Sequence, residues 1–179
     1  HFQVADEMPS WDLSLFRKIQ RNWYAVFSRE NGWNSQFLNT HDHTRQVTRY
    51  GNDGQYRVQS AKLLATMLHT LPGTPAVFQG EEIGMTGVHF ASIDDYHDIR
   101  IKLNYRDEMA KGRDAEEVLR ELQPLSRDNS RTPMQWDDSE EAGFTQGAPW
   151  IKVNPNYREI NVGQDLRSPD SIYRYYQRL

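Results

Sequence analysis

The sequence places one amphipathic segment between two short apolar runs, and this order restricts the fold more than any other feature of the chain. The runs cover residues 35–39 and 76–79, and polar residues follow each of them. Between them, apolar residues of the segment 55–70 recur at three- and four-residue spacing, which predicts a helix that Pro72 and Gly73 end. A strand, a helix and a strand in this order form a crossover unit, which pairs the two strands in parallel.

Polar side chains follow both predicted strands. His41 and Asp42 come directly after the first strand, and Glu81 and Glu82 come shortly after the second. The carboxyl ends of parallel strands lie at one edge of the sheet, where α/β proteins place their functional residues. We therefore expect one of the two glutamates to face the same mouth as Asp42.

Periodicity and helix-start signals on either side of this unit predict further helices. Apolar residues recur at helical spacing over 11–28, behind a possible cap at Ser10. A capping box predicts a helix over 92–109. Acidic residues at 114–117 open another helix, which Pro124 ends. The chain as a whole is therefore expected to have an α/β fold.

The segment 124–168 is predicted to be a loop, because it shows little periodicity and is rich in Asn, Pro, Gly and Trp. Loops of this length usually carry function rather than merely connecting two elements. After it, Ser168 at a cap position and Pro169 at the first helical position predict a last helix that contains Ile172 and Tyr176. No stop signal follows, so we expect the chain to end inside this helix.

Composition narrows the classes of function. The chain has 179 residues, a formal net charge of -4 at pH 7, 12% aromatic residues and no cysteine. So many aromatic residues argue against a disordered chain. A hydrophobic share of 37% is low for a globular protein and indicates a thin core. We therefore expect a folded piece that lacks some of its packing partners. Without cysteine there is no disulfide framework and no thiol nucleophile, which favours a cytoplasmic location. Interspersed charges and the lack of a long apolar run argue against nucleic-acid and membrane binding.

His41 and Asp42 are the first candidate site residues. Adjacent groups that accept and donate hydrogen bonds are what a polyol such as a sugar ring requires. An alternative is that Asp42 caps the following turn and that His41 bonds to the backbone. The remaining histidines are scattered along the chain, so neither a metal site nor a cofactor is expected.

Glu81 and Glu82 allow a second interpretation, in which one of them works with Asp42 in glycoside hydrolysis. That reaction uses two carboxyl groups, which lie about 5 to 5.5 Å apart in retaining enzymes. Equally, one glutamate could form an ion pair with a nearby arginine or cap the residues that follow it.

The segment 126–131 contains Arg127, Arg131 and an Asx-type turn. Such a segment can hold a loop rigid or present a guanidinium to a ligand, and the two roles can coexist. Trp136 and Trp150, further along the predicted loop, can stack on sugar faces or form a local core.

The segment 37–42, followed by Arg45, resembles the alpha-amylase superfamily of glycoside hydrolases, glycoside hydrolase family 13. Segments 73–85 and 126–137 are similar to the oligo-1,6-glucosidase and alpha-glucosidase branch of that superfamily. The likeness continues through 142–157 and so covers nearly all of the chain. The combination of these motifs is highly specific.

The resemblance implies a (β/α)8 TIM barrel, which is an α/β fold. By that likeness, residues 1–179 correspond to the C-terminal portion of the catalytic barrel, from helix six through the first half of helix eight. The N-terminal part of the barrel and a C-terminal β-domain are expected to lie outside the sequence. This expectation accounts for the thin core, and the chain alone is expected to be inactive.

Members of the family hydrolyse with retention, using a nucleophilic aspartate, an acid/base glutamate and a third aspartate. Asp42 matches the third aspartate, whose implied catalytic role is to hydrogen-bond ring hydroxyls and favour the oxocarbenium-like state. His41 would bind the same hydroxyls, and Arg131, in preference to Arg127, would grip the non-reducing glucose. Arg45 matches an arginine that supports the floor of the site, and it is counted with the substrate-binding residues. The nucleophile and the acid lie outside the sequence.

The leading hypothesis is an exo-acting retaining alpha-glucosidase that hydrolyses α-1,6 or α-1,4 bonds, or both, of short oligosaccharides. Within the same branch, the alternatives are a trehalose-6-phosphate hydrolase and a sucrose isomerase. An alternative of a different class is a non-catalytic carbohydrate-binding remnant. Arg100 stands where the family commonly has an acid, and this leaves the substrate preference open.

Overall fold

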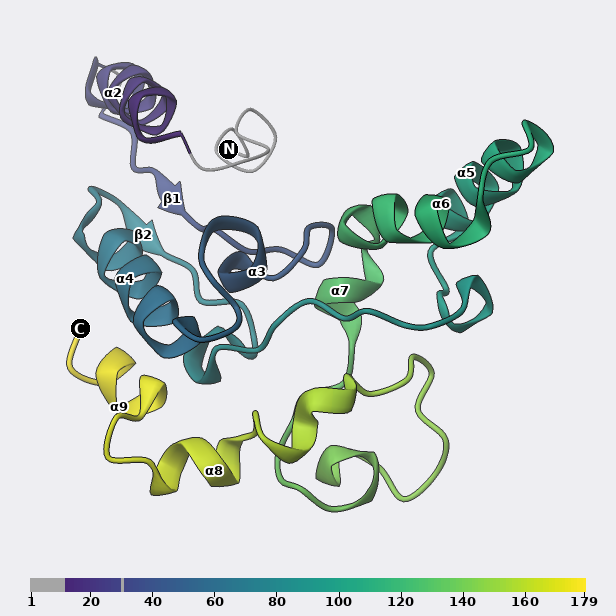
Figure 1. Ribbon diagram of the computed structural model, residues 1–179. Coiled ribbons are helices and arrows are strands. Elements are labelled where there is room, and N and C mark those ends of the chain that lie inside the picture. Colours follow the sequence, from purple (N-terminus) through teal and green to yellow (C-terminus); the bar gives the residue numbers. More distant parts are fainter. Residues whose placement is uncertain (1–11, 30) are drawn as a thin grey trace.

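The computed structural model describes residues 12–29 and 31–179, and the regular structure of this part is almost entirely helical (Figure 1). The α-helices are α2 (Leu13–Arg29), α3 (Gln46–Tyr50), α4 (Arg57–Thr70), α5 (Ile99–Ala110), α6 (Ala115–Leu122), α7 (Asp128–Arg131), α8 (Val162–Arg167) and α9 (Ile172–Tyr176). The strands are β1 (Ser35–Gln36) and β2 (Thr74–Pro75). Short 3₁₀ turns cover Glu81–Ile83, Ile93–Asp95, Gln123–Leu125, Glu140–Gly143 and Pro155–Arg158. None of the helices in the described ranges is long and apolar enough to cross a membrane.

The two strands pair in parallel, in the register Ser35 with Thr74 and Gln36 with Pro75. The backbone N–H of Ala76 extends the pairing by donating to Gln36 O at 2.8 Å. Helices α3 and α4 lie between the strands in the sequence. The predicted strand–helix–strand crossover with parallel strands is therefore confirmed.

The bounds of the strands differ from the predicted runs 35–39 and 76–79. β1 is confined to the first two residues of its run, and β2 lies directly before its run. Each strand has a single neighbour within the described residues, so few backbone bonds are available to extend it. Helix α4 matches the predicted helix over 55–70, whereas α3 is too short to produce a periodic pattern and was not predicted.

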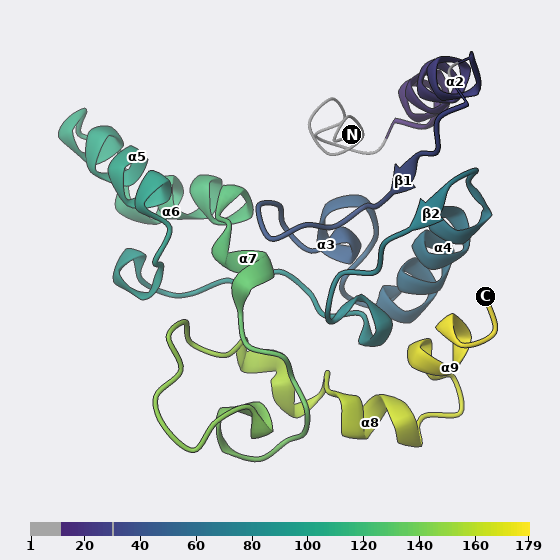
Figure 2. The same cartoon turned by 180° about the vertical axis from the view of Figure 1, so that it is seen from behind.

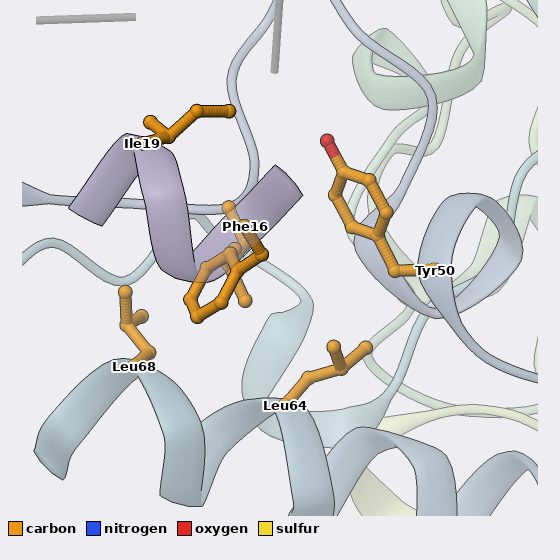
Figure 3. Packing of buried hydrophobic residues seen from close by; sticks show 6 residues of the cluster. Phe16, Ile19, Tyr50, Leu64 and Leu68 are labelled. Carbon is orange, nitrogen blue, oxygen red and sulfur yellow. The ribbon is translucent and has the colours of Figure 1, made fainter. Parts of the chain in front are cut away.

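Helix α2 packs across α4 through an apolar cluster (Figure 3). Phe16 and Ile19 of α2 lie over Leu64 and Leu68, which belong to the face of α4 that the sequence predicts to be apolar. Tyr50 of α3 borders the same cluster. Burial of these side chains, each contributing about 1.5 to 3 kcal/mol, holds both helices beside the sheet.

The predicted helix over 11–28 is confirmed as α2, which begins at Leu13. Asp12 Oδ1 accepts hydrogen bonds from the N–H groups of Ser14 and Leu15, at 2.9 Å each, as a capping side chain does. Ser10, the predicted cap, lies outside the described residues.

Helices α5 and α6 pack side by side at one end of the molecule, far from α2 and α4 in both views (Figure 1 and Figure 2). Asp98 caps α5 and Asp114 caps α6, each accepting a hydrogen bond from a backbone N–H of the first turn. The helix predicted over 92–109 is therefore split, because Ser92 caps a separate 3₁₀ turn and α5 starts only at Ile99. The helix predicted to open at 114–117 is confirmed as α6.

The segment 124–168 is not the plain loop that the sequence predicts, since α7 and α8 form within it. The predicted start of the last helix at Ser168 is also wrong, because the Ser168 backbone closes the end of α8. Helix α9 begins at Ile172 instead, and Ser171 is its cap, accepting a bond from Arg174 N at 3.0 Å. Packing of α9 against α4 returns the C-terminal segment to the sheet.

The outer edges of the sheet lead to a prediction about the chain by itself. Within the described residues β1 and β2 pair only with each other, and the apolar side chains of Leu63 and Val77 are exposed. Unpaired strand edges promote pairing between chains. We predict that residues 1–179, expressed alone, are molten or aggregate, so that a thermal melt followed by circular dichroism shows no cooperative transition. A cooperative melt of a monomer would contradict this prediction.

Candidate active site

Asp42 lies in a tight turn after β1, where the sequence predicts a site residue. Thr40 Oγ1 accepts a hydrogen bond from Asp42 N at 3.2 Å and bonds to His43 Nδ1 at 2.9 Å. These local bonds replace secondary structure in fixing the turn. The Asp42 side chain is 48% exposed, so its carboxylate is accessible to a ligand.

A cavity of about 490 Å³ opens beside Asp42. Its polar lining includes Thr48 and Arg49 of α3 on one side and Arg100 and Asn104 of α5 on the other. Ligand sites in proteins commonly have volumes of about 300 to 1,000 Å³. The cavity therefore has the size and the hydrogen-bonding groups to take a sugar unit.

Arg131, at the end of α7, reaches the turn that carries Asp42. Its Nη2 donates to Asp42 Oδ1 at 2.7 Å, and its Nε donates to His41 O at 2.7 Å. His41 Nε2 lies 3.4 Å from Asp42 Oδ2. The structure thus brings His41, Asp42 and Arg131 together, as expected of residues that share one site.

Arg127 forms its ion pair with Asp98, the cap of α5, and not with Asp42. The backbone N, Nε and Nη2 of Arg127 donate to the Asp98 carboxylate at 2.9 to 3.1 Å. Burial alone would raise the pKa of Asp98, but the hydrogen bonds from Arg127 hold that pKa below its ordinary value. The two arginines therefore differ in position, since Arg127 fixes the loop and Arg131 places its guanidinium against Asp42.

Asp128 and Asn129, which lie in the segment 126–131 that the sequence predicts can hold a loop rigid, anchor α7 to its neighbours. Asp128 Oδ2 accepts a bond from Asp98 N at 3.0 Å. Asn129 Oδ1 accepts from Val88 N at 2.8 Å, and its Nδ2 donates to Gln123 O at 2.7 Å. Both side chains are buried, so each supplies a partner to backbone groups that water does not reach. This anchoring sets the position of the arginine that ends α7.

Two threonines also tie the loop after β1 to distant segments. Thr44 Oγ1 donates to Pro124 O, and Thr48 Oγ1 accepts from Gly87 N at 2.8 Å. Sequence reasoning missed both, because a hydroxyl that bonds to a distant backbone group leaves no periodic pattern. A polar residue within a short buried segment is the sequence feature that could have predicted such a hydrogen bond for both threonines.

Arg45, the fourth predicted site residue, is fully buried. Its Nη1 donates to Gln79 O, and its guanidinium lies 5.3 Å from the centre of the Phe78 ring. Glu81 is buried close to Arg45, and burial raises the pKa of its carboxyl to about 8. Neither side chain lines the cavity beside Asp42. The geometry therefore favours a supporting role for Arg45. A carboxyl group with a pKa of about 8 is mostly protonated at neutral pH, so Glu81 is a close neighbour of Arg45 and not its ion-pair partner.

The other candidates lie away from this cavity. Glu82, Trp136 and Trp150 are not part of its lining. The Trp150 side chain is exposed and its ring lies 5.5 Å from that of His97. Stacking of the two tryptophans on sugars stays a prediction. In the part of the chain that the structure describes, no three His, Asp or Glu side chains form a group that could hold a metal ion.

The buried carboxyl of Glu81 leads to a prediction about pH. Because its pKa is about 8 in the folded protein and about 4.5 when unperturbed, the folded state binds more protons than the unfolded chain between these values. Its contribution to the free energy of unfolding is full below pH 4.5 and is lost as the pH rises to about 8. Glu81→Gln should therefore flatten the fall of the melting temperature over this range, measured by thermal melts of the purified full-length protein.

The matched control is Glu140→Gln, which changes an exposed glutamate and should leave the pH dependence of the melting temperature as it is in the wild type. An unchanged pH dependence in Glu81→Gln would contradict the prediction.

Comparison with known proteins identifies the family of this chain. The family model described as alpha amylase, catalytic domain, matches residues 3–179. The oligo-1,6-glucosidase of Bacillus cereus is 56% identical over 181 residues, which cover 98% of this chain and 32% of that protein. The oligo-1,6-glucosidase of Parageobacillus thermoglucosidasius is 52% identical over 170 residues, which cover 94% of this chain and 30% of that protein.

A solved structure of a related enzyme also superposes closely on this chain. The crystal structure of Bacillus licheniformis trehalose-6-phosphate hydrolase superposes with a TM-score of 0.90 at 46% identity, over 94% of this chain and 30% of that one. The chain thus spans about 30% of the length of the relatives that it matches. Since the family match covers almost every residue, this chain belongs to the alpha-amylase catalytic-domain family.

Proposed function

We propose that this chain is part of an exo-acting retaining alpha-glucosidase, which hydrolyses α-1,6 or α-1,4 bonds, or both, of short oligosaccharides. The observation that carries the proposal is the double contact of Arg131 with His41 O and Asp42 Oδ1. Of these three residues, Asp42 lines the cavity of sugar size. The identity of 56% to an oligo-1,6-glucosidase supports the choice of an oligosaccharide as substrate.

In this proposal Asp42 is the catalytic residue that the chain supplies. Its Oδ1 is held by Arg131, and its Oδ2 faces His41 Nε2 at 3.4 Å. A sugar hydroxyl in this place can donate to Asp42 and accept from His41. Such bonds strengthen as positive charge develops at the anomeric carbon, so they stabilise the transition state more than the bound substrate. The nucleophile and the acid/base group come from a part of the protein outside this sequence.

The same proposal includes the place of the chain in its parent domain. We infer that residues 1–179 are the C-terminal portion of a (β/α)8 barrel, with α2 as helix six and α4 as helix seven. The parallel order of β1 and β2 and the 30% of the relatives' length that the chain spans support this inference. A cytoplasmic location, which the lack of cysteine favours, belongs to the same proposal.

A trehalose-6-phosphate hydrolase is the second candidate. Arg49 and Arg100 both line the cavity beside Asp42, and guanidinium groups bind phosphate well. The two candidates differ in their preferred substrate, so kcat/KM on isomaltose and on trehalose-6-phosphate separates them. A higher kcat/KM on isomaltose supports the glucosidase, and a higher value on trehalose-6-phosphate supports the second candidate. Binding of either sugar without turnover would indicate a non-catalytic carbohydrate-binding protein.

Replacement of the catalytic carboxylate should act on the chemical step. In the full-length protein, Asp42→Asn should lower kcat about 1,000-fold, equivalent to about 4 kcal/mol of lost transition-state stabilisation, and should change KM much less. Steady-state kinetics on an aryl α-glucoside measures both constants. Asp170→Asn, which alters an exposed carboxylate paired with Lys62, is the control that should keep wild-type kinetics. Near-normal kcat in Asp42→Asn would show that another carboxylate has this role.

Removal of the guanidinium at position 131 should act mainly on substrate binding. Arg131→Ala is expected to raise KM by a larger factor than it lowers kcat, because Arg131 would grip a hydroxyl away from the bond that breaks. Arg127→Ala should instead lower the melting temperature, since Arg127 pairs with the buried Asp98. Equal activity of the wild type on long starch chains and on short oligosaccharides would contradict the exo-acting pocket.

A further inference from the structure

The cavity beside Asp42 and the residues that contact the Asp42 carboxylate share one member, Asp42 itself. In the proposed function, His41, Asp42 and Arg131 hold the glucose unit at the non-reducing end of the substrate. Neither His41 nor Arg131 is part of the lining of the cavity, which has a volume of about 490 Å³. The cavity therefore extends from a side of Asp42 that these two residues do not cover.

A glucoside has two parts, which are joined at the bond that breaks. One part is the glucose, and the other is the leaving group, which in a short oligosaccharide is another sugar. Because the glucose contacts Asp42 in the proposed function, the leaving group lies next to it on a neighbouring side of Asp42. The cavity is of sugar size and occupies such a place, and it presents polar side chains from two helices, namely Thr48, Arg49, Arg100 and Asn104.

His43 is the residue of the lining that directly follows Asp42 in the chain. It is half-buried, and its Nδ1 forms a hydrogen bond of 2.9 Å with Thr40 Oγ1. The backbone N–H of His43 also donates to Thr40 O at 3.4 Å. Thr40 thus fixes both the main chain and the side chain of His43. The imidazole therefore enters the wall of the cavity in a set orientation.

The surroundings of His43 are fixed on both sides. The Thr40 hydroxyl that bonds to His43 also accepts from Asp42 N at 3.2 Å, so one threonine sets the carboxylate and the imidazole relative to each other. Beyond His43, Thr44 Oγ1 donates to Pro124 O, and both of these residues line the cavity. Side chains that are held in place before binding lose little conformational entropy when a ligand arrives.

The arginines in the lining are engaged in part by the protein. Arg100 Nη2 donates to Leu125 O at 2.9 Å, and the Arg49 guanidinium lies 5.2 Å from the centre of the Tyr50 ring. A guanidinium can only donate hydrogen bonds, whereas an imidazole nitrogen donates or accepts according to which ring nitrogen carries the proton. A neutral sugar hydroxyl, which also donates and accepts, is therefore matched better by an imidazole than by a guanidinium.

We propose that the cavity beside Asp42 holds the sugar that leaves when the glucosidic bond breaks, and that the His43 imidazole contacts a hydroxyl of this leaving sugar. This inference rests on the proposed function, in which the glucose lies against Asp42, and it adds the place where the rest of the substrate binds. His43 is then a residue that determines specificity for the leaving group.

The test compares two substrates that share the glucose and differ in the leaving group, both assayed with the full-length protein. Isomaltose has a sugar as leaving group, and trehalose-6-phosphate takes its place if the wild type prefers it. The second substrate is an aryl α-glucoside whose aryl group carries no hydroxyl. We expect His43→Ala to lower kcat/KM about tenfold on the sugar substrate, as loss of one hydrogen bond does, and to change it less than about twofold on the aryl α-glucoside.

Further variants separate the contact with the sugar from the structure of the turn. Glutamine keeps a polar group at about the reach of the imidazole, so His43→Gln should retain about half of the wild-type kcat/KM on the sugar substrate. His89→Ala is the matched control, because His89 is exposed, bonds to Gln123 Oε1 at 3.0 Å and is not part of the lining. It should keep both values of kcat/KM. Arg131→Ala should lower both by similar factors, because the glucose that Arg131 would grip is common to the two substrates.

Several outcomes would overturn the inference. An unchanged kcat/KM of His43→Ala on the sugar substrate would show that His43 does not contact the leaving sugar. Similar losses on both substrates would show that it acts on the glucose or on the position of Asp42. A His43→Gln protein as impaired as His43→Ala, or failure of both to fold, would leave His43 a structural role alone.

The same assays distinguish this inference from the proposed function. Wild-type protein without turnover of isomaltose, trehalose-6-phosphate and the aryl α-glucoside contradicts the proposed function itself. An active wild type, combined with a loss in His43→Ala that does not depend on the leaving group, contradicts the leaving-group inference alone.

Discussion

The parallel pairing of β1 and β2 determines where the turn with Asp42 and the segment after β2 lie. The ladder is short, yet it sends the segments that follow both strands to the same edge of the sheet. The turn with Asp42 leaves β1 there, and the segment with Gln79 leaves β2. Arg45 can bridge the two because the strands bring their ends together. Helix α4 connects the two strands and so allows them to run in parallel. Its apolar face packs against α2, and the chain then leads from the end of α4 to the start of β2.

Polar bonds, rather than apolar contacts, hold the second half of the site. Buried apolar side chains form several small clusters within the described residues and not one continuous core. The segments between these clusters are fixed by side chains that bond to backbone, above all Asp98, Asp128 and Asn129. A satisfied network of this kind is rigid, but loss of one member leaves its buried partner without a bond. The hydrogen-bond network around α7 therefore keeps Arg131 in one position, although only 37% of the residues in the chain are hydrophobic.

Sequence reasoning succeeded where a pattern repeats and failed where single contacts decide. Periodicity predicted α2 and α4, and an acidic opening with a proline stop predicted α6. The resemblance predicted that Asp42 and Arg131 share a site, and their contact at 2.7 Å agrees with this. The start of α9 was misplaced because Ser168 and Ser171 are both plausible caps. The Ser168 N–H closes the end of α8, and the Asp165 carboxylate accepts bonds from Ser171 Oγ and Ile172 N at the start of α9. The burial of Arg45 could not be read from sequence, because an arginine after a site residue is equally compatible with contact to substrate and with support from below.

The contact between Arg131 and Asp42 joins residues 89 positions apart, and the bond from Thr44 to Pro124 spans 80 positions. Closing loops of this length costs chain entropy before any contact compensates for it, whereas helices close through local bonds. We therefore expect α4, α5 and α6 to form early and the two halves of the site to meet late in folding. A chain halted before that step would already have its helical content and would still lack the arrangement of His41, Asp42 and Arg131.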